Sequence, residues 1–216
     1  MVPFVKRLPT ASGEHLDVVV HELPGWRASA PARSRWIDLV HEPFIAKDKQ
    51  RADWDWDWRI EIPTLTFGVG ITKRPRIYQL CLAEDFFPLA MIAVLETERW
   101  IWNHRQSALF LWYMTGAPAT AVASGRSPKL ITSAALDMAL TVSLNGRANG
   151  RLWLHAAPEG GGRLLDWYES KGLERVPLGT RLPGPRFSER INDGRYFCVT
   201  ADNAGVVSDS MKEYRR

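Results

Sequence analysis

The sequence predicts a single α/β (α+β) domain, residues 1–216, in which helices flank a central sheet. Its 216 residues are 45% hydrophobic and 24% charged, which is typical of a globular chain long enough to bury a core without disulfides or metals. The second half of the chain reads strand, strand, helix, strand, helix, strand. The first of these helices is apolar over so much of its circumference that we expect it to be covered on more than one side.

The first 75 residues contain few predicted elements, because Pro and Gly interrupt the first 35. A continuous β-branched run predicts a strand at Leu16–Leu23, and a short helix is expected at Arg35–Ala46. The segment Arg59–Gly70 reads as extended and rich in turns, with a hydrophobic period of two. We therefore expect residues 1–75 to be irregular and residues 76–200 to form the core of the domain.

Residues 76–200 show a more regular pattern. Apolar runs predict strands at Arg76–Leu82, Leu89–Ile101, Ala108–Met114, Arg151–Ala156 and Arg195–Thr200. Two helices are expected, one from Ile131 until Asn145 and Gly146 stop its pattern, and one at Arg163–Lys171 closing on Gly172. Small residues predict a loop at Ala119–Pro128, and the basic end, Lys212–Arg216, reads as a frayed tail.

Charge and composition argue against several classes of partner. Lys and Arg number 28 against 24 Asp and Glu, and they are scattered rather than gathered in a stripe, which disfavours nucleic acid. No segment approaches the roughly 18 apolar residues of a membrane span, and Met1–Pro9 lacks signal-peptide features, so we expect a cytoplasmic protein with no membrane partner. Cys81 and Cys198 are far apart and the five His form no ligand-spaced pair, so we expect core thiols and no metal.

A motif near the end of the core carries a family resemblance. The segment Leu152–Leu173, LWLHAAPEGGGRLLDWYESKGL, resembles the C-terminal motif of the GCN5-related N-acetyltransferases (GNAT), in which a strand and turn lead to a helix ending in Tyr, three residues and Gly-Phe. Those positions are Tyr168, Gly172 and Leu173 here. The resemblance covers about Pro88–Val176, and it implies a mixed, largely antiparallel sheet flanked by helices.

The resemblance also implies a chemistry. A GNAT enzyme transfers an acyl group from acetyl-CoA, or another acyl-CoA, to an amine without a metal. The main chain at Tyr113, Met114 and Thr115 would polarise the thioester carbonyl, and Tyr168 would protonate the leaving sulfur. Tyr168 is explained equally well as an apolar-face residue of its helix. Glu96 and Glu98 are candidate bases, although strand-end carboxylates are usually solvated.

The loop that would hold the coenzyme departs from the family pattern. The matching positions run from Ser127 to Thr132, and both family glycines are missing. Glycine lets the main chain approach a pyrophosphate closely, and Leu130 could obstruct that approach. The helix N-terminus remains, so we expect the coenzyme to be bound by six residues in or next to this segment: Arg126, Lys129, Leu130, Ile131, Thr132 and Ser133.

The run Asp53–Trp58, DWDWDW, has two interpretations. If it is extended, Trp and Asp occupy opposite faces, and Trp54, Asp55 and Trp56 would attract a cationic amine acceptor. Alternatively, the Trp side chains complete the core while the Asp side chains meet water. For the first 75 residues as a whole, two roles are open: they would cover the acceptor side, as elements before the central sheet do in the family that the chain resembles, or form a homodimer contact.

Two function classes remain open from the sequence. The first is an acyl-CoA-dependent N-acyltransferase acting on an unidentified amine, which the retained Tyr168 and Gly172 favour. The second is a catalytically inactive protein of the same fold that has lost coenzyme A binding and serves as an interaction module, which the missing loop glycines favour. A relative that uses a different acyl donor would also explain the changed loop.

Overall fold

The computed structural model describes residues 1–23, 25–68, 75–122, 127–183 and 190–216. Eight strands form one sheet in the order β1-β2-β3-β4-β5-β6-β10-β7. Their bounds are β1 Arg7–Pro9, β2 His15–Leu23, β3 Arg76–Leu82, β4 Pro88–Arg99, β5 Ser107–Gly116, β6 Leu152–His155, β7 Glu174–Arg175 and β10 Tyr196–Val199. Among the described strands only β5 and β6 run parallel, so the mixed, largely antiparallel sheet is confirmed. A separate pair is formed by β8 Arg181–Leu182 and β9 Arg190–Ile191.

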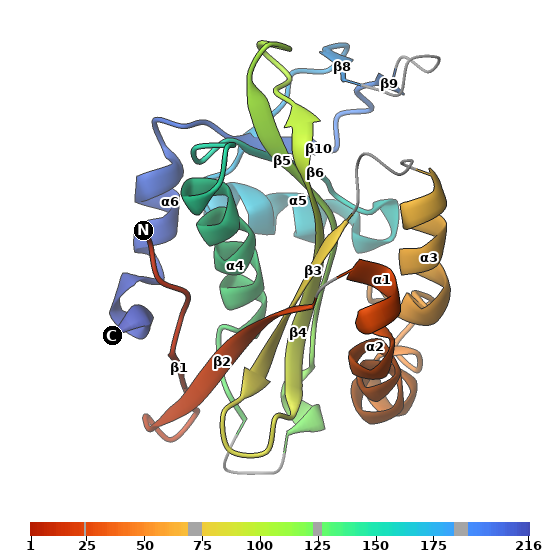
Figure 1. Cartoon of the computed structure of the whole chain (residues 1–216), viewed down its shortest axis with the longest axis vertical. Coiled ribbons are helices and arrows are strands. Elements are labelled where there is room, and N and C mark those ends of the chain that lie inside the picture. Colours follow the sequence, from red (N-terminus) through yellow and green to blue (C-terminus); the bar gives the residue numbers. More distant parts are fainter. Residues whose placement is uncertain (24, 69–74, 123–126, 184–189) are drawn as a thin grey trace.

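Helices cover both faces of this sheet (Figure 1). One face carries α1 Gly25–Ala28, α2 Ala30–Trp36 and α3 Trp58–Gly68, and the other carries α4 Ile131–Asn145 and α6 Ala204–Asp209. A further helix, α5 Gly161–Ser170, follows β6. Because both faces are covered, every side chain from Leu89 to Val94 is fully buried, which explains why continuous apolar runs predicted the central strands correctly. Within the described ranges, no helix has the length and apolar character needed to cross a membrane.

The short helix expected at Arg35–Ala46 is present but begins earlier. It starts as α2 and passes into η1, a π-helix at Ile37–Ile45. Pro43 lies inside η1 and has no main-chain N–H, so regular α-helical bonding cannot continue through it. The wider turn of η1 is visible in the bond of 2.8 Å from the Ala46 N–H to the His41 carbonyl.

The prediction of an extended segment at Arg59–Gly70 is wrong for residues 59–68, because a helix, α3, spans Trp58–Gly68. Residues 69 and 70 lie outside the described ranges. Asp57 caps this helix, since its Oδ1 accepts the Arg59 N–H at 2.8 Å. Pro63 lies inside the helix and leaves the Arg59 carbonyl without its usual partner. The buried Arg33 guanidinium donates to the carbonyls of Trp58, at 2.7 Å, and Arg59, at 3.4 Å.

The prediction of a frayed tail at Lys212–Arg216 is also wrong. Residues Lys212–Arg215 form a 3₁₀-helix, η4, and the carbonyl of Tyr214 accepts the Lys6 N–H at 2.8 Å. Arg215 is buried and pairs with Asp137 of α4. A basic side chain in a short tail gives no local sign of a carboxylate in a distant helix, so this docking was not visible in the sequence.

Candidate active site

The sheet opens where β5 and β6 separate. The two strands pair over three residues, Leu109–Leu111 with Leu152–Leu154, and β5 then continues to Gly116 with β4 as its partner on the other side. A bulge lies at the point of separation, because Ala93 of β4 faces Tyr113 while Val94 faces Leu111. Beyond Leu111 and Leu154, therefore, the centre of the sheet has a gap.

A cavity of about 400 Å³ occupies this gap. It draws side chains from β5, the end of β6, the first turn of α4, α5 and the segment before α3. The residues that line it are Arg51, Ala52, Asp53, Trp56, Phe110, Leu111, Trp112, Tyr113, Met114, Thr115, Gly116, Thr132, Leu154, His155, Ala157, Pro158, Leu164, Tyr168 and Tyr196. The cavity thus reaches elements from both faces of the sheet.

The main chain of Met114 faces the gap. Ala117 donates its N–H to the Leu89 carbonyl on the β4 side at 2.7 Å, whereas the Gly116 carbonyl accepts from Arg51 at 2.8 Å. Main-chain groups of an antiparallel strand point to alternate sides, so Met114 presents its N–H and carbonyl in the same direction as Gly116. Within the described ranges these two groups have no hydrogen-bond partner across the gap.

The first turn of α4 meets the end of β5 at Gly116. A Cβ on Gly116 would lie 3.1 Å from Ile131 Cγ2, so the strand and the helix approach closely here. Leu130, the residue before α4, has a φ of +63° and a side chain that is 38% exposed. Leu130 therefore adopts the left-handed backbone that glycine adopts readily, at about 1–2 kcal/mol of strain. Thr132 lines the cavity, and the first N–H groups of a helix lack partners within it.

Tyr168 reaches the cavity from α5 and packs against Phe197, with ring centroids 5.3 Å apart. The side chain is 6% exposed, and burial raises the pKa of its hydroxyl. No other described residue hydrogen-bonds this hydroxyl. The Tyr168 hydroxyl is therefore protonated at neutral pH and is available as a hydrogen-bond donor.

A buried polar cluster closes the cavity beside Thr115. Arg51 donates two hydrogen bonds to the Asp53 carboxylate, both of 2.8 Å, and the Thr115 hydroxyl donates to the same carboxylate. His41 lies 3.3 Å from the Asp53 carbonyl. The N-terminal segment is thereby fastened to the end of β5, and the charges of Arg51 and Asp53 compensate each other.

An aromatic wall lies next to this cluster. Trp56 packs edge-on against Tyr113, with ring centroids 4.9 Å apart, and Trp58 contacts the same ring at 5.8 Å. The Tyr113 hydroxyl donates to Glu61 of α3. Of the candidate acceptor-binding residues, Trp56 thus lines the cavity.

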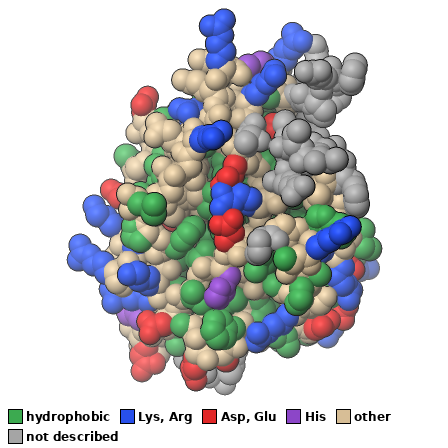
Figure 2. Space-filling view, viewed as in Figure 1, with side chains coloured by type: hydrophobic (Ala, Val, Ile, Leu, Met, Phe, Trp, Pro, Cys, Tyr) green, Lys and Arg blue, Asp and Glu red, His purple; other side chains and the backbone are tan. Residues whose placement is uncertain are grey.

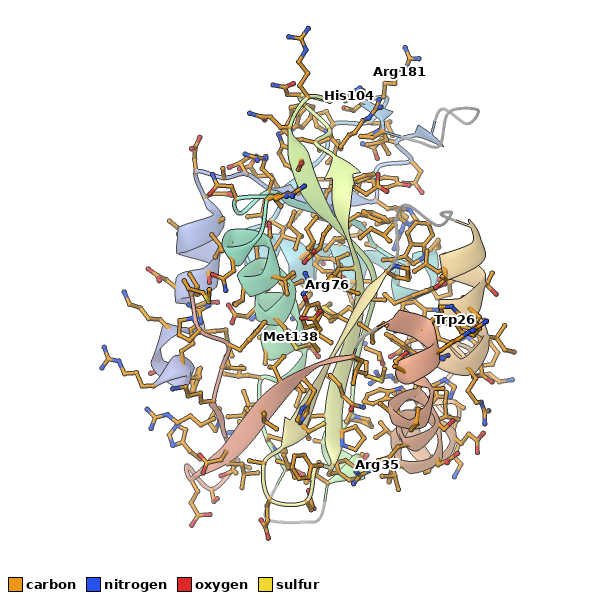
Figure 3. All side chains as sticks on the ribbon, in the orientation of Figure 1. Trp26, Arg35, Arg76, His104, Met138 and Arg181 are labelled. Atoms are coloured by element: carbon orange, nitrogen blue, oxygen red, sulfur yellow. The ribbon has the colours of Figure 1, made fainter. Side chains whose placement is uncertain are left out.

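The other candidates lie elsewhere. The run at 53–58 forms turns rather than an extended strand, so Asp55 is exposed and Trp54 lies under Lys49, and neither lines the cavity. Glu96 pairs with Arg76, which also pairs with Glu22 and is labelled in Figure 3. Figure 2 shows basic and acidic side chains side by side near the middle of this face.

Glu98 lies opposite Ala108 in the β4–β5 ladder and does not line the cavity either. Of the expected coenzyme-binding residues, Lys129 is exposed and its N–H bonds to the Pro9 carbonyl at 2.7 Å, Ile131 is buried, and Ser133 is half-buried in the first turn of α4. Arg126 lies outside the described residues.

Solved structures share this architecture. A Tyr-to-Phe mutant of the toxin AtaT, bound to the C-terminus of the antitoxin AtaR and acetyl-CoA, has 12% identity and a TM-score of 0.51 over 88% of this chain and 97% of its own. The aminoglycoside N(6')acetyltransferase from Legionella pneumophila subsp. pneumophila has 10% identity and a TM-score of 0.50 over 88% and 95%. The chain has the GNAT fold. Its sequence matches no model of a protein family and no curated protein.

Within this GNAT fold, four polar cavity residues were missed by sequence reasoning: Arg51, Asp53, His155 and Tyr196. Local spacing does not reveal Arg51 and Asp53, because their partners Thr115 and Gly116 lie more than 60 residues away in the chain. One signal could have found His155. It ends a strand parallel to its neighbour, and sites in α/β sheets gather at the carboxyl ends of such strands.

Proposed function

We propose that the protein is an acyl-CoA-dependent N-acyltransferase, with acetyl-CoA as donor and an amine as acceptor. The observation that carries the proposal is the cavity at the β5–β6 gap, toward which Met114 turns an N–H that has no partner among the described residues. A neighbour of the same fold, AtaT, was solved with acetyl-CoA, which supports this donor. The sequence resemblance at Tyr168–Leu173 supports it independently.

In this proposal the Met114 N–H stabilises the negative charge that develops on the thioester oxygen. A fixed main-chain donor in a site shielded from water stabilises such charge well, because it needs no reorganisation during the reaction. Thr115 and Gly116 are held by Asp53 and Arg51, which fix the strand around Met114. Tyr113 and Thr115, the residues on either side of Met114, line the same cavity.

The residues at the start of α4 fit a coenzyme pyrophosphate by conformation and by charge. The left-handed Leu130 keeps the backbone shape of the missing glycine, and the N-terminus of α4 supplies N–H groups and a favourable partial charge. Thr132 and Ser133 add hydroxyl donors, and the exposed Lys129 adds a positive charge. We expect the pyrophosphate to bind there.

Tyr168 is proposed to give its proton to the departing sulfur. Its pKa is raised by burial, so the hydroxyl is protonated at neutral pH and available as an acid. On the acceptor side, Trp56 and Tyr113 offer aromatic faces to the amine.

Calorimetric titration with acetyl-CoA and with free coenzyme A tests the proposal. Micromolar binding of acetyl-CoA and release of free thiol in the presence of an amine panel are expected. Absence of binding at millimolar ligand would refute the proposal and favour an interaction module of the GNAT fold that has lost its coenzyme.

A further inference from the structure

His155 stands at the apex of the gap. It is the residue after Leu154, the last residue of β6 that pairs with β5, and it lines the cavity. Side chains alternate along a strand, so His155 points to the sheet face opposite Leu154. It lies directly across from Tyr196 of β10, with ring centroids 4.5 Å apart.

Tyr168 reaches the gap from the other face. Its ring packs on Phe197, the residue after Tyr196, and neighbouring residues of β10 face opposite ways. An acyl group held at Met114 would therefore have the Tyr168 hydroxyl on one side and the His155 imidazole on the other. Direct transfer can use this arrangement, because one side chain can protonate the leaving sulfur while the other takes the proton that the nitrogen loses.

The imidazole of His155 is oriented by a carboxylate. Its Nε2 lies 2.9 Å from Asp193 Oδ2, and Asp193 Oδ1 accepts the Arg195 N–H at 3.0 Å. Burial raises the pKa of Asp193, but the hydrogen bonds from His155 and from the Arg195 N–H lower it by more, so it stays ionised. An Nε2–H donated to Asp193 places the free lone pair on Nδ1. Nδ1 has no hydrogen-bond partner in the described part of the chain.

The other carboxylates near the cavity are already engaged. Asp53 accepts from Arg51 and Thr115, and Glu61 accepts from Tyr113. Among the described residues that line the cavity, His155 is thus the basic group with an available lone pair.

We propose that His155 is the general base of the transfer and that Asp193 is its positioning residue; this inference rests on the proposed function. The amine nitrogen attacks the thioester carbon and forms the C–N bond, while the carbonyl electron pair moves to oxygen beside the Met114 N–H. His155 Nδ1 takes the proton that nitrogen loses. The oxygen electron pair then re-forms the C=O bond as the C–S bond breaks, sulfur leaves with its electron pair and takes the Tyr168 proton, and exchange with solvent restores both side chains.

Bromoacetyl-CoA tests the placement of His155 without a known acceptor. This analogue carries an electrophilic carbon beside the acyl carbonyl, so a nucleophile at the reacting atoms displaces bromide and becomes alkylated. Peptide mass spectrometry should find the label on His155, and excess acetyl-CoA should prevent it. His155→Gln should abolish the label with the Kd for acetyl-CoA changed less than twofold, and His104→Gln, at an exposed histidine, should leave it intact.

Turnover tests the proton transfer. With tryptamine as the probe amine, chosen for the aromatic acceptor wall, His155→Gln should lower kcat by about 100-fold or more with KM for acetyl-CoA unchanged. Asp193→Asn should slow alkylation of His155 and lower kcat while KM for acetyl-CoA stays unchanged. A merely structural defect would not lower kcat while leaving this KM unchanged. Labelling of another residue, absence of label despite acetyl-CoA binding, or wild-type turnover in His155→Gln overturns the base. Absence of acetyl-CoA binding to the wild type overturns the proposed function itself.

Discussion

Arg215→Met is expected to destabilise the protein by about 3–5 kcal/mol at neutral pH, because it leaves a buried carboxylate without its charge partner. Asp137 of α4 accepts hydrogen bonds from the Arg215 guanidinium and, at 3.3 Å, from the Ser208 hydroxyl. Its second oxygen, Oδ2, is buried and has no partner in the described residues. When the guanidinium is removed, the Asp137 carboxylate therefore loses this donor and gains no other in its place.

The loss should depend on pH in a defined direction. Burial raises the pKa of Asp137 to about 6, above the ordinary 3.8, although the Arg215 charge opposes this rise. The native state thus binds the Asp137 proton more tightly than the unfolded state, so the carboxyl's stabilising contribution is complete below pH 3.8 and is lost as pH rises through about 6. Without Arg215 the pKa rises further. The variant should therefore lose less stability at about pH 5 than at about pH 7.

Urea unfolding of the wild type and the variant at these two pH values measures the effect. Arg216→Met, at the neighbouring exposed arginine, is the matched control and should change stability by less than about 0.5 kcal/mol. Asp137→Leu combined with Arg215→Met should recover most of the loss, because it removes the uncompensated charge. An equal loss at both pH values, or no recovery in the double variant, would show that the ion pair is not the cause.

Three further outcomes are expected. Tyr168→Phe should lower kcat with little change in acetyl-CoA affinity, and an unchanged rate would remove this hydroxyl from the mechanism. Leu130→Gly should tighten acetyl-CoA binding in calorimetry, because it removes a side chain that obstructs the approach of the pyrophosphate to the main chain; weaker or equal binding would contradict the alignment of this loop. Gly150→Ala should cost about 1–3 kcal/mol in thermal unfolding, because Gly150 has a φ of +85° and a Cβ there would lie 2.6 Å from the Ala204 Cβ; an unchanged melting temperature would contradict this crowding.

Most of the sheet could be predicted because its residues carry the signal locally. β3 is predicted at its observed bounds, Arg76–Leu82, and β4, β5, β6 and β10 differ from prediction by one or two residues at each end. α4 was predicted for the same reason, since its apolar residues recur at helical spacing. The sequence does not predict α3, because the hydrophobic residues of Arg59–Gly70 follow a period of two and Asp57, the cap of α3, is one of three alternating aspartates.

The candidate site was predictable only in part. Tyr168 belongs to a motif that is contiguous in the chain, Leu152–Leu173, and the order of the elements before it predicts that the end of β5 and the start of α4 lie beside the same cavity. The pairs Asp53–Thr115 and His155–Asp193 join residues 62 and 38 positions apart, and only the fold brings them together. Aspartates at two-residue spacing look equivalent in the sequence, yet the turn buries Asp53 and leaves Asp55 exposed.

The separation of β5 and β6 places the open edge of β5 in the interior of a sheet. Open edges usually lie at the margins of sheets, where they attract other chains. Here the edge of β5 lines a cavity together with α5 and the N-terminal segment before α3, so it is not laid open along the margin of the sheet. A molecule that enters must be slender and extended, about one strand wide, and amide groups of its own would let it continue the hydrogen bonding that the sheet interrupts.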